Sequence, residues 1–186
     1  SATVLVSGNT KVAYADVPYE TYSYNFWGDD VLQPHAYLYS KTISSKDFKK
    51  ALSYPQDMFY FEDALYIADT NNSRVLKLSL EGQVLMEITC ADGAEDLLNK
   101  PQGVFVNTDG NIYVADTDNS RIVEYSPEGR FLRKIGRPES DLITDTQEYK
   151  PTKVVVDKAG RIYAIAYGIN MGLVEFNHNG EFQGFM

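Results

Sequence analysis

Residues 101–136 read PQGVFVNTDGNIYVADTDNSRIVEYSPEGRFLRKIG and contain four short apolar runs, each followed by residues typical of turns. The runs alternate apolar and polar positions and are rich in β-branched and aromatic side chains, which predicts four β-strands. Asp109-Gly110 is a strong hairpin signal between the first two strands. Pro127-Glu128-Gly129 separates the third strand from the fourth. The stretch therefore predicts a four-stranded meander.

Nearly the same text occurs twice more, at residues 55–88 and 151–186. Pro101 is matched by Pro55 and Pro151, which lie 46 residues upstream and 50 residues downstream. A period of this length with about four strands per unit is typical of a propeller blade and not of a helical repeat. One such sheet alone would leave both of its apolar faces in water, so it must stack on its neighbours. The predicted fold is an all-β propeller.

We interpret residues 1–186 as one partial propeller domain. Three blades and a remnant are too few to close a typical ring of about four to eight blades. We therefore expect the chain to be part of a longer one; association of partial rings is the alternative. The expected divisions are 16–54 for a half-blade and linker, and 55–100, 101–150 and 151–186 for the three full blades.

The first 15 residues allow two interpretations. They fit a hairpin around residues 7–10, or the end of a secretory signal, because Ala13-Tyr14-Ala15 has the small-x-small cleavage pattern. Under the second interpretation the mature protein begins near Asp16 and works outside the cytoplasm.

Residues 16–43 are rich in aromatic side chains and predict the outer half of a blade. Tyr19–Phe26 is expected to be a third strand, followed by a turn at residues 28–30. Tyr37–Ile43 is expected to be the fourth strand of the same blade. Aromatic residues at this density favour packing between blades over a carbohydrate-stacking surface.

Composition narrows the classes of partner. The chain has 17 basic and 26 acidic residues and a net charge of −9, which argues against a nucleic-acid partner. Cys90 is the only cysteine, so no intrachain disulfide is expected. No apolar run approaches the length that spans a bilayer. Any membrane attachment would come from segments outside this chain.

Loops at one end of the predicted sheets are where we expect binding residues. The linkers 44–54, 91–100 and 137–150 join each fourth strand to the next first strand and vary most in length. Because the first strand of a blade is innermost, these linkers should emerge beside the central channel, on the same face as loops 70–73 and 117–120. Topology alone gives the candidate ligand contacts, which are Gln56, Asp57, Asn72, Gln102, Asn119, Lys153 and Asn170.

Two acid–base pairs at these loops favour a structural role. Asp69 and Asp116 end second strands, and Arg74 and Arg121 follow five residues later. We expect each aspartate to accept amides of the turn that follows, the intervening asparagine to adopt a left-handed conformation, and each arginine to fork back onto the carboxylate. Catalytic residues normally occur once in a ring, so the recurrence in two blades indicates a structural device.

No metal or cofactor site is predicted. A calcium site would need convergent carboxylates at the channel mouth. Among the first-strand starts only Asp57 supplies one, and Lys153 would repel a cation. The two histidines, His35 and His178, show neither a ligand pair nor a nucleophile partner, and no phosphate-binding motif is present.

The repeated stretches resemble the NHL repeat, a β-propeller family. Asp57 stands where the family favours glycine, and the third copy departs from the signature between Ala164 and Asn170. The matching positions of the best copy are Pro101, Gly103, Ile112, Tyr113, Ala115, Asp116, Asn119, Arg121 and Gly129. Those of the first copy are Pro55, Leu65, Tyr66, Ala68, Asp69, Asn72, Arg74 and Gly82.

The resemblance implies a partial six-bladed ring and, most often, a non-catalytic platform that binds a protein, peptide or glycan through its loop face. The aromatic N-terminal stretch before the repeats is similar to secreted or membrane-attached bacterial proteins, which implies an extracellular or cell-surface location. Related six-bladed propellers include calcium-dependent, gluconolactonase-type hydrolases and amidating lyases. A hydrolase or lyase of that type is the alternative function, and only then is calcium expected.

Overall fold

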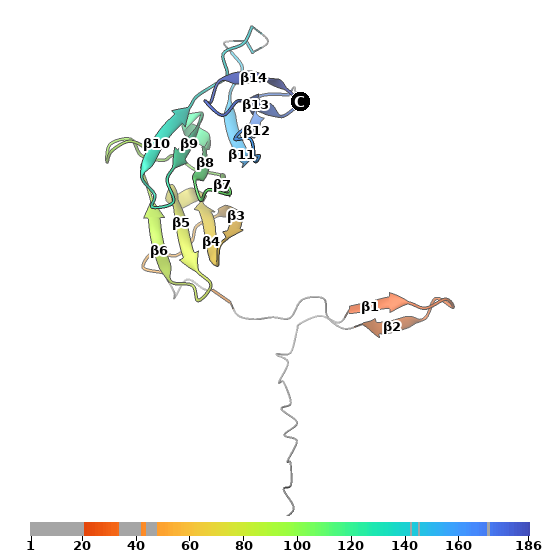
Figure 1. Cartoon of the computed structure of the whole chain (residues 1–186). Coiled ribbons are helices and arrows are strands. Elements are labelled where there is room, and N and C mark those ends of the chain that lie inside the picture. Colours follow the sequence, from red (N-terminus) through yellow and green to blue (C-terminus); the bar gives the residue numbers. More distant parts are fainter. Residues whose placement is uncertain (1–20, 34–41, 44–47, 142, 145, 171) are drawn as a thin grey trace, which may run out of the picture. The chain divides into compact units, whose positions relative to one another are not determined.

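The structure, a computed structural model, describes residues 21–33, 42–43, 48–141, 143–144, 146–170 and 172–186 (Figure 1). The predictions for residues 1–15 lie outside this part of the chain. The described residues form β-strands and short 3-10 turns, without an α-helix, and so without a helix that could cross a membrane. The chain divides into two units, Ser1–Thr42 and Ile43–Met186, and each is described by itself.

The second unit contains three four-stranded antiparallel sheets, each built from consecutive strands. Figure 1 shows them following one another from yellow through green to blue. The predicted all-β, partial propeller fold is confirmed. The strands of the first blade are β3 (Pro55–Phe61), β4 (Ala64–Asp69), β5 (Arg74–Ser79) and β6 (Val84–Ile88). Those of the second are β7 (Gly103–Val106), β8 (Ile112–Asp116), β9 (Arg121–Tyr125) and β10 (Phe131–Ile135). Those of the third are β11 (Lys150–Val156), β12 (Ile162–Tyr167), β13 (Val174–Phe176) and β14 (Phe182–Phe185).

The middle blade is buried on both of its faces because its strands alternate. On β8, Val114 packs into the core shared with the first blade, whereas Tyr113 and Ala115 pack into the core shared with the third. Val114 and Ala115 are completely inaccessible to solvent. The far face of the first blade is covered in part by the linker, through Ile43, Phe48 and Leu52. Apolar burial between sheets therefore holds the blades together.

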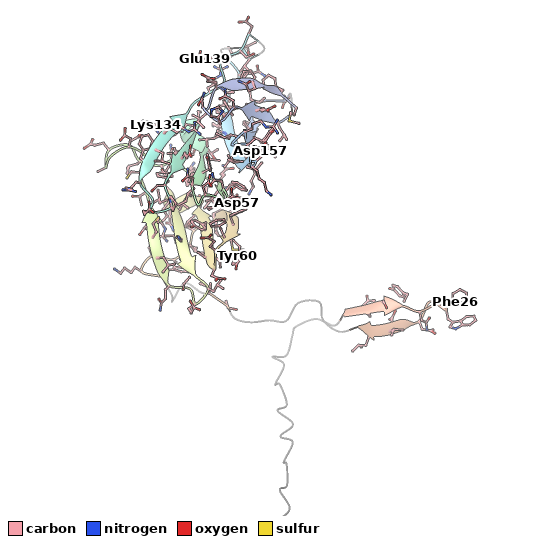
Figure 2. The ribbon with its side chains drawn as sticks, in the orientation of Figure 1. Phe26, Asp57, Tyr60, Lys134, Glu139 and Asp157 are labelled. Atoms are coloured by element: carbon pink, nitrogen blue, oxygen red, sulfur yellow. The ribbon has the colours of Figure 1, made fainter. Side chains whose placement is uncertain are left out.

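A short hairpin forms the described part of the first unit. β1 (Thr21–Tyr24) pairs with β2 (Asp30–Gln33) in a two-stranded sheet. Figure 2 shows Phe26 at its turn. The turn is closed by Asn25, whose side-chain oxygen accepts hydrogen bonds from the amides of Trp27 and Asp29 at 2.8 and 2.9 Å.

The strand that pairs back differs from the prediction. Asn25 closes the turn so tightly that pairing resumes at Asp30, so β2, and not Tyr37–Ile43, follows β1. Of the expected fourth strand, residues 37–41 lie outside the described residues, and Thr42 and Ile43 are not in a strand.

The innermost strands approach closely at Gly103. A Cβ atom built there would lie 2.7 Å from the carbonyl oxygen of Thr152 and 3.1 Å from the Cα of Lys153. Both atoms are backbone of β11, so neither can move aside cheaply. The glycine therefore sets the spacing between the inner strands of the second and third blades.

We expect Gly103→Ala to lower the free energy of unfolding by about 1–3 kcal/mol, because the methyl group forces the two strands apart. Urea denaturation measures the change. Gly136→Ala is the matched control, since a Cβ there meets no atom within 4 Å. Equal stability of the two variants would contradict the close approach.

Candidate functional site

Two buried carboxylates organise the loop face, which is the end of the sheets that carries the linkers and the β4–β5 and β8–β9 loops. Asp69 ends β4 and Asp116 ends β8, and each is 0% exposed. Arg74 Nε lies 2.7 Å from Asp69 Oδ2, and Arg121 Nε lies 2.7 Å from Asp116 Oδ2. Both ion pairs expected from the sequence are present.

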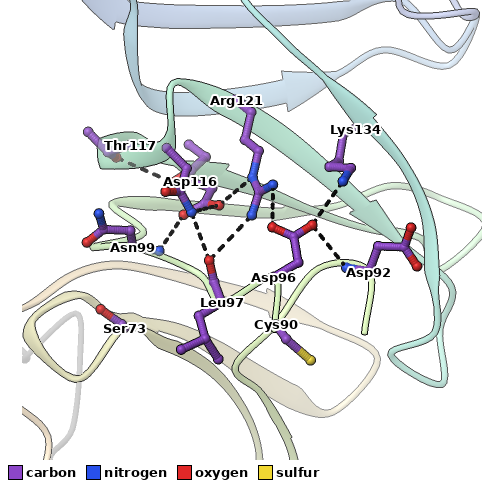
Figure 3. Close-up of polar contacts among 12 residues, drawn as sticks. Ser73, Cys90, Asp92, Asp96, Leu97, Asn99, Asp116, Thr117, Arg121 and Lys134 are labelled. Atoms are coloured by element: carbon purple, nitrogen blue, oxygen red, sulfur yellow. Dashed lines mark hydrogen bonds and ion pairs between the residues drawn. The ribbon is translucent and has the colours of Figure 1, made fainter. Parts of the chain in front are cut away.

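In the second blade the carboxylate also clamps the linker to the loop (Figure 3). Asp116 Oδ1 accepts the backbone amide of Asn99 at 2.7 Å, and Oδ2 accepts Asn119 Nδ2 at 2.8 Å. The same Nδ2 donates to the carbonyl of Leu97 at 2.8 Å. Burial lowers the pKa of Arg121, but its hydrogen bonds to acidic partners outweigh that effect and raise it. Both oxygens of Asp116 and the Nδ2 of Asn119 are thus hydrogen-bonded.

The first blade repeats the clamp with its own linker. Asp69 Oδ1 accepts the amide of Ser53 at 2.7 Å, while Asn72 Nδ2 bonds both Asp69 Oδ2 and the carbonyl of Ala51 at 2.8 Å. Arg74 donates to the carbonyl of Lys50 at 2.6 Å. The recurrence shows one device that fixes each linker to the loop beside it.

Two details of the clamp differ from the prediction. The left-handed residues are Ser73 and Ser120, with φ of 51° and 56°, and not Asn72 or Asn119. The aspartates accept amides of the preceding linker and not of the turn that follows. Both differences have the same cause. Each asparagine amide bridges the aspartate and a linker carbonyl, so the next residue, a serine, adopts the left-handed conformation that reverses the chain direction.

Asp96 extends the clamp in the second blade, and sequence reasoning missed it. Its oxygens lie 2.8 Å from Arg121 Nη1 and 2.9 Å from Lys134 Nζ. The hydrogen bonds from Lys134 and then Arg121 lower the pKa of Asp96 to about 2. Asp96 lies in a linker whose copies share no pattern, so no repeat signal marked it.

The third blade replaces the clamp with apolar contacts. Counting from the aligned strands, Ala166 stands where Asp116 stands in the second blade, Ile169 replaces Asn119, and Tyr149 replaces Asn99. All three are buried in the core shared with the second blade. Burial also raises the pKa of the Tyr149 hydroxyl. These three side chains are called the apolar plug below. The third copy departs from the repeat because the apolar plug, and not a polar clamp, holds the linker against the loop.

At the inner strands, Asp57 and Lys153 meet across Gly103 (Figure 2 labels Asp57). Lys153 Nζ lies 2.6 Å from Asp57 Oδ1, and Asp57 Oδ2 accepts the amide of Val104 at 3.0 Å. Lys153 also donates to the carbonyl of Gln56 at 3.3 Å. These residues, predicted as separate ligand contacts, form an internal tie between the first and third blades.

The seven candidate contacts therefore divide into two groups. Four are engaged within the protein, namely Asp57, Lys153, Asn72 and Asn119. The side chains of the other three make no hydrogen bond or ion pair within the described residues, and these are Gln56, Gln102 and Asn170. Gln56 lines a 410 Å³ groove beside Leu52 and Met58, and Asn170 lines a 390 Å³ pocket on the third blade.

Other titratable groups of the described residues make structural contacts. No three His, Cys, Asp or Glu side chains of the described residues converge as metal ligands. Buried Glu124 accepts hydrogen bonds from Tyr113 and Asn111 at 2.8 and 2.9 Å and pairs with Arg133, which ties β8, β9 and β10 together. His178 contributes only its backbone carbonyl, to Arg133. His35 lies outside the described residues.

Asp116→Ala should lower the free energy of unfolding by about 1–3 kcal/mol, because it removes the buried acceptor of the Asn99 amide, Asn119 Nδ2 and Arg121 Nε, although Asp96 still pairs with Arg121. Asp118→Ala is the control: it removes a partly exposed ion pair with Lys100 at 3.2 Å and should cost about 0–1 kcal/mol. Chemical denaturation measures both. Similar losses for the two variants would contradict the clamp.

Asp96→Asn should show a pH-dependent effect. The pKa of Asp96 falls from 3.8 to about 2 on folding, so its charge stabilises the protein above pH 3.8 and that contribution disappears as the pH falls toward 2. Wild type should therefore exceed the variant in urea midpoint at pH 7, and the gap should close between about pH 4 and pH 2. Asp109→Asn, at a position without an ion pair among the described residues, is the control. A gap that is constant with pH would overturn the assignment.

Comparison with known proteins agrees with the fold. Residues 60–147 match the family model described as the SMP-30/Gluconolactonase/LRE-like region. No curated protein sequence matches the chain. The assignment to the NHL type in particular stays a prediction.

Solved structures similar to this chain include propeller lyases. A streptogramin B lyase is 12% identical with a TM-score of 0.53, over 88% of this chain and 46% of its own. A catalytically inactive virginiamycin B lyase from Staphylococcus aureus, solved with quinupristin, is 12% identical with a TM-score of 0.53, over 88% and 47%. A protein of unknown function from Bacteroides caccae is 16% identical with a TM-score of 0.50, over 67% and 46%. The chain thus spans about half the length of the structures it matches, and the likeness shows the β-propeller fold.

Proposed function

We propose that these blades serve as a non-catalytic platform that binds a protein, peptide or glycan through the loop face. The observation that carries the proposal is the set of three unengaged amide side chains, Gln56, Gln102 and Asn170. An amide both donates and accepts hydrogen bonds, which suits recognition of uncharged polar groups. Gln56 lies in β3, Gln102 directly before β7 and Asn170 in the loop after β12. These segments are close in sequence to the linkers and loop that the clamps and the apolar plug hold, so binding would cost little ordering.

The inner strands give this platform a defined position. β3, β7 and β11 lie next to one another, and Gln56 and Gln102 sit at the starts of the first two. With a net charge of −9 the chain suits neutral or basic partners and not nucleic acid. The pattern Ala13-Tyr14-Ala15 supports an extracellular or cell-surface location as part of the proposal.

A metal-assisted hydrolase or lyase is the second candidate, because the matching family model covers gluconolactonases and two similar structures are lyases. The inner strands of this chain favour it less. The carboxylate of Asp57 already holds Lys153 and the amide of Val104, so binding a cation there would break both contacts. A catalytic centre would have to draw on other ligands.

Array binding tests the platform. Labelled protein is applied to peptide and glycan arrays. The affinity of each ligand found is then measured by biolayer interferometry for wild type and for the triple variant Gln56→Ala, Gln102→Ala, Asn170→Ala. We expect the variant to lose at least about tenfold in affinity, which corresponds to about 1.4 kcal/mol. The matched control is Asp109→Ala with Lys158→Ala, in hairpin turns at the other ends of the inner strands.

Two results would refute the platform: ligands that bind the triple variant as well as wild type, or turnover. For turnover, the protein is assayed with gluconolactone and with quinupristin in about 1 mM calcium, a concentration that saturates many extracellular calcium sites. Thermal unfolding with and without calcium is followed in parallel. The platform predicts no product and an unchanged melting temperature, since only a bound ion would stabilise the fold.

A further inference from the structure

The pocket on the third blade has a lining that the other blades lack. It measures 390 Å³ and is formed by Gln147, Glu148, Ala166, Tyr167, Gly168 and Asn170. This volume lies in the range of about 300–1,000 Å³ that small-molecule sites occupy. Two segments build it: the linker before β11 and the end of β12 with the loop that follows.

The pocket exists where the repeat breaks. In the second blade the equivalent of Ala166 is Asp116, a larger side chain whose carboxylate is buried and bonded to Asn119. The loop after β12 is also one residue longer than the loop after β8, judged from the strand pairs Val114–Val123 and Ala164–Val174. Removing the clamp and lengthening the loop opens the space.

Close contacts between the loop and the linker form the floor of the pocket. Gly168 has φ of +89°, and a Cβ atom there would overlap the carbonyl oxygen of Glu148. Gln147 is held by the amide of Thr144, which donates to its Oε1 at 3.0 Å, and its own Nε2 reaches the carbonyl of Gly168 at 3.4 Å. Only glycine allows the loop and linker to lie this close.

The lining combines one aromatic ring with groups that bond hydroxyls. Tyr167 is 68% exposed, so a face of its ring is open to a ligand. Asn170 offers an unengaged amide, and Glu148 offers a carboxylate. Lys150 Nζ lies 3.7 Å from Glu148 Oε1 and offsets its charge. The pocket is therefore polar but close to neutral.

We propose that this pocket binds a neutral saccharide, with a C–H face of one sugar ring on Tyr167 and its hydroxyls on Glu148 and Asn170. The inference rests on the proposed binding function and names the ligand of one part of the loop face. Sugars are apolar on one face and carry hydroxyls that both donate and accept at the rim, which matches an aromatic ring flanked by acceptors and an amide. Glu148 would repel an anion, and Lys150, which lies outside the lining, already partly neutralises that carboxylate.

Titration with three neutral oligosaccharides tests the proposal: cellohexaose, mannohexaose and chitohexaose, each by calorimetry and by saturation-transfer NMR. We expect at least one to bind. Tyr167→Ala should weaken it at least tenfold, whereas Tyr167→Phe, which keeps the ring, should stay within about threefold. Glu148→Gln keeps an acceptor but changes the charge, and should weaken binding less than Tyr167→Ala.

Tyr54→Ala is the matched control, because Tyr54 is also 68% exposed and precedes the first inner strand. Binding that is lost equally in this variant would overturn the proposal, as would no binding of any of the three sugars. Failure of the saccharide proposal can be distinguished from failure of the proposed binding platform. If none of the three sugars binds, but array ligands lose affinity in a Gln56→Ala, Gln102→Ala double variant that keeps Asn170, the saccharide pocket alone is rejected.

Discussion

The rest of the structure depends on the burial of sheet faces between neighbouring blades. A four-stranded sheet with apolar residues on both faces is unstable alone, and alternation along β8 sends Val114 to one neighbour and Ala115 to the other. Stacking fixes the angle and distance between blades, and Gly103 fixes how closely the inner strands approach. Only on that scaffold do loops far apart in the sequence share one face.

Each linker has to be held against the loop beside it, and the chain does so in two ways. The first two blades use a buried aspartate with an asparagine and an arginine, and the third uses Ala166, Ile169 and Tyr149. A buried ion pair and an apolar replacement of similar volume often have comparable stability, because the desolvation of charge offsets the attraction. The two solutions can therefore coexist in one domain without weakening it.

The fold could be predicted from the sequence because the sequence repeats. Three copies of the same turns and apolar alternations support one interpretation even where a single copy is ambiguous. The ion pairs of Asp69 and Asp116 were predictable for the same reason. The link between Asp57 and Lys153 was not, since each residue occurs once and their contact requires that Gly103 leave a gap between them. Asp96 was missed because the linkers of the three blades share no sequence pattern. Pairing across blades is a property of three-dimensional stacking that spacing along the chain does not encode.

The polar clamp and the apolar plug also differ in whether they leave the polar side chains of the loop free to contact a ligand. In the first two blades the clamp uses the polar side chains of the loop, so the Nδ2 groups of Asn72 and Asn119 are already engaged within the protein. In the third, apolar side chains beneath the loop take over its support, and Tyr167 and Asn170 face solvent instead. A polar side chain can either hydrogen-bond within the protein to hold the loop or hydrogen-bond to a ligand. Because the third blade transfers the first task to its core, it is the blade whose loop is free for the second.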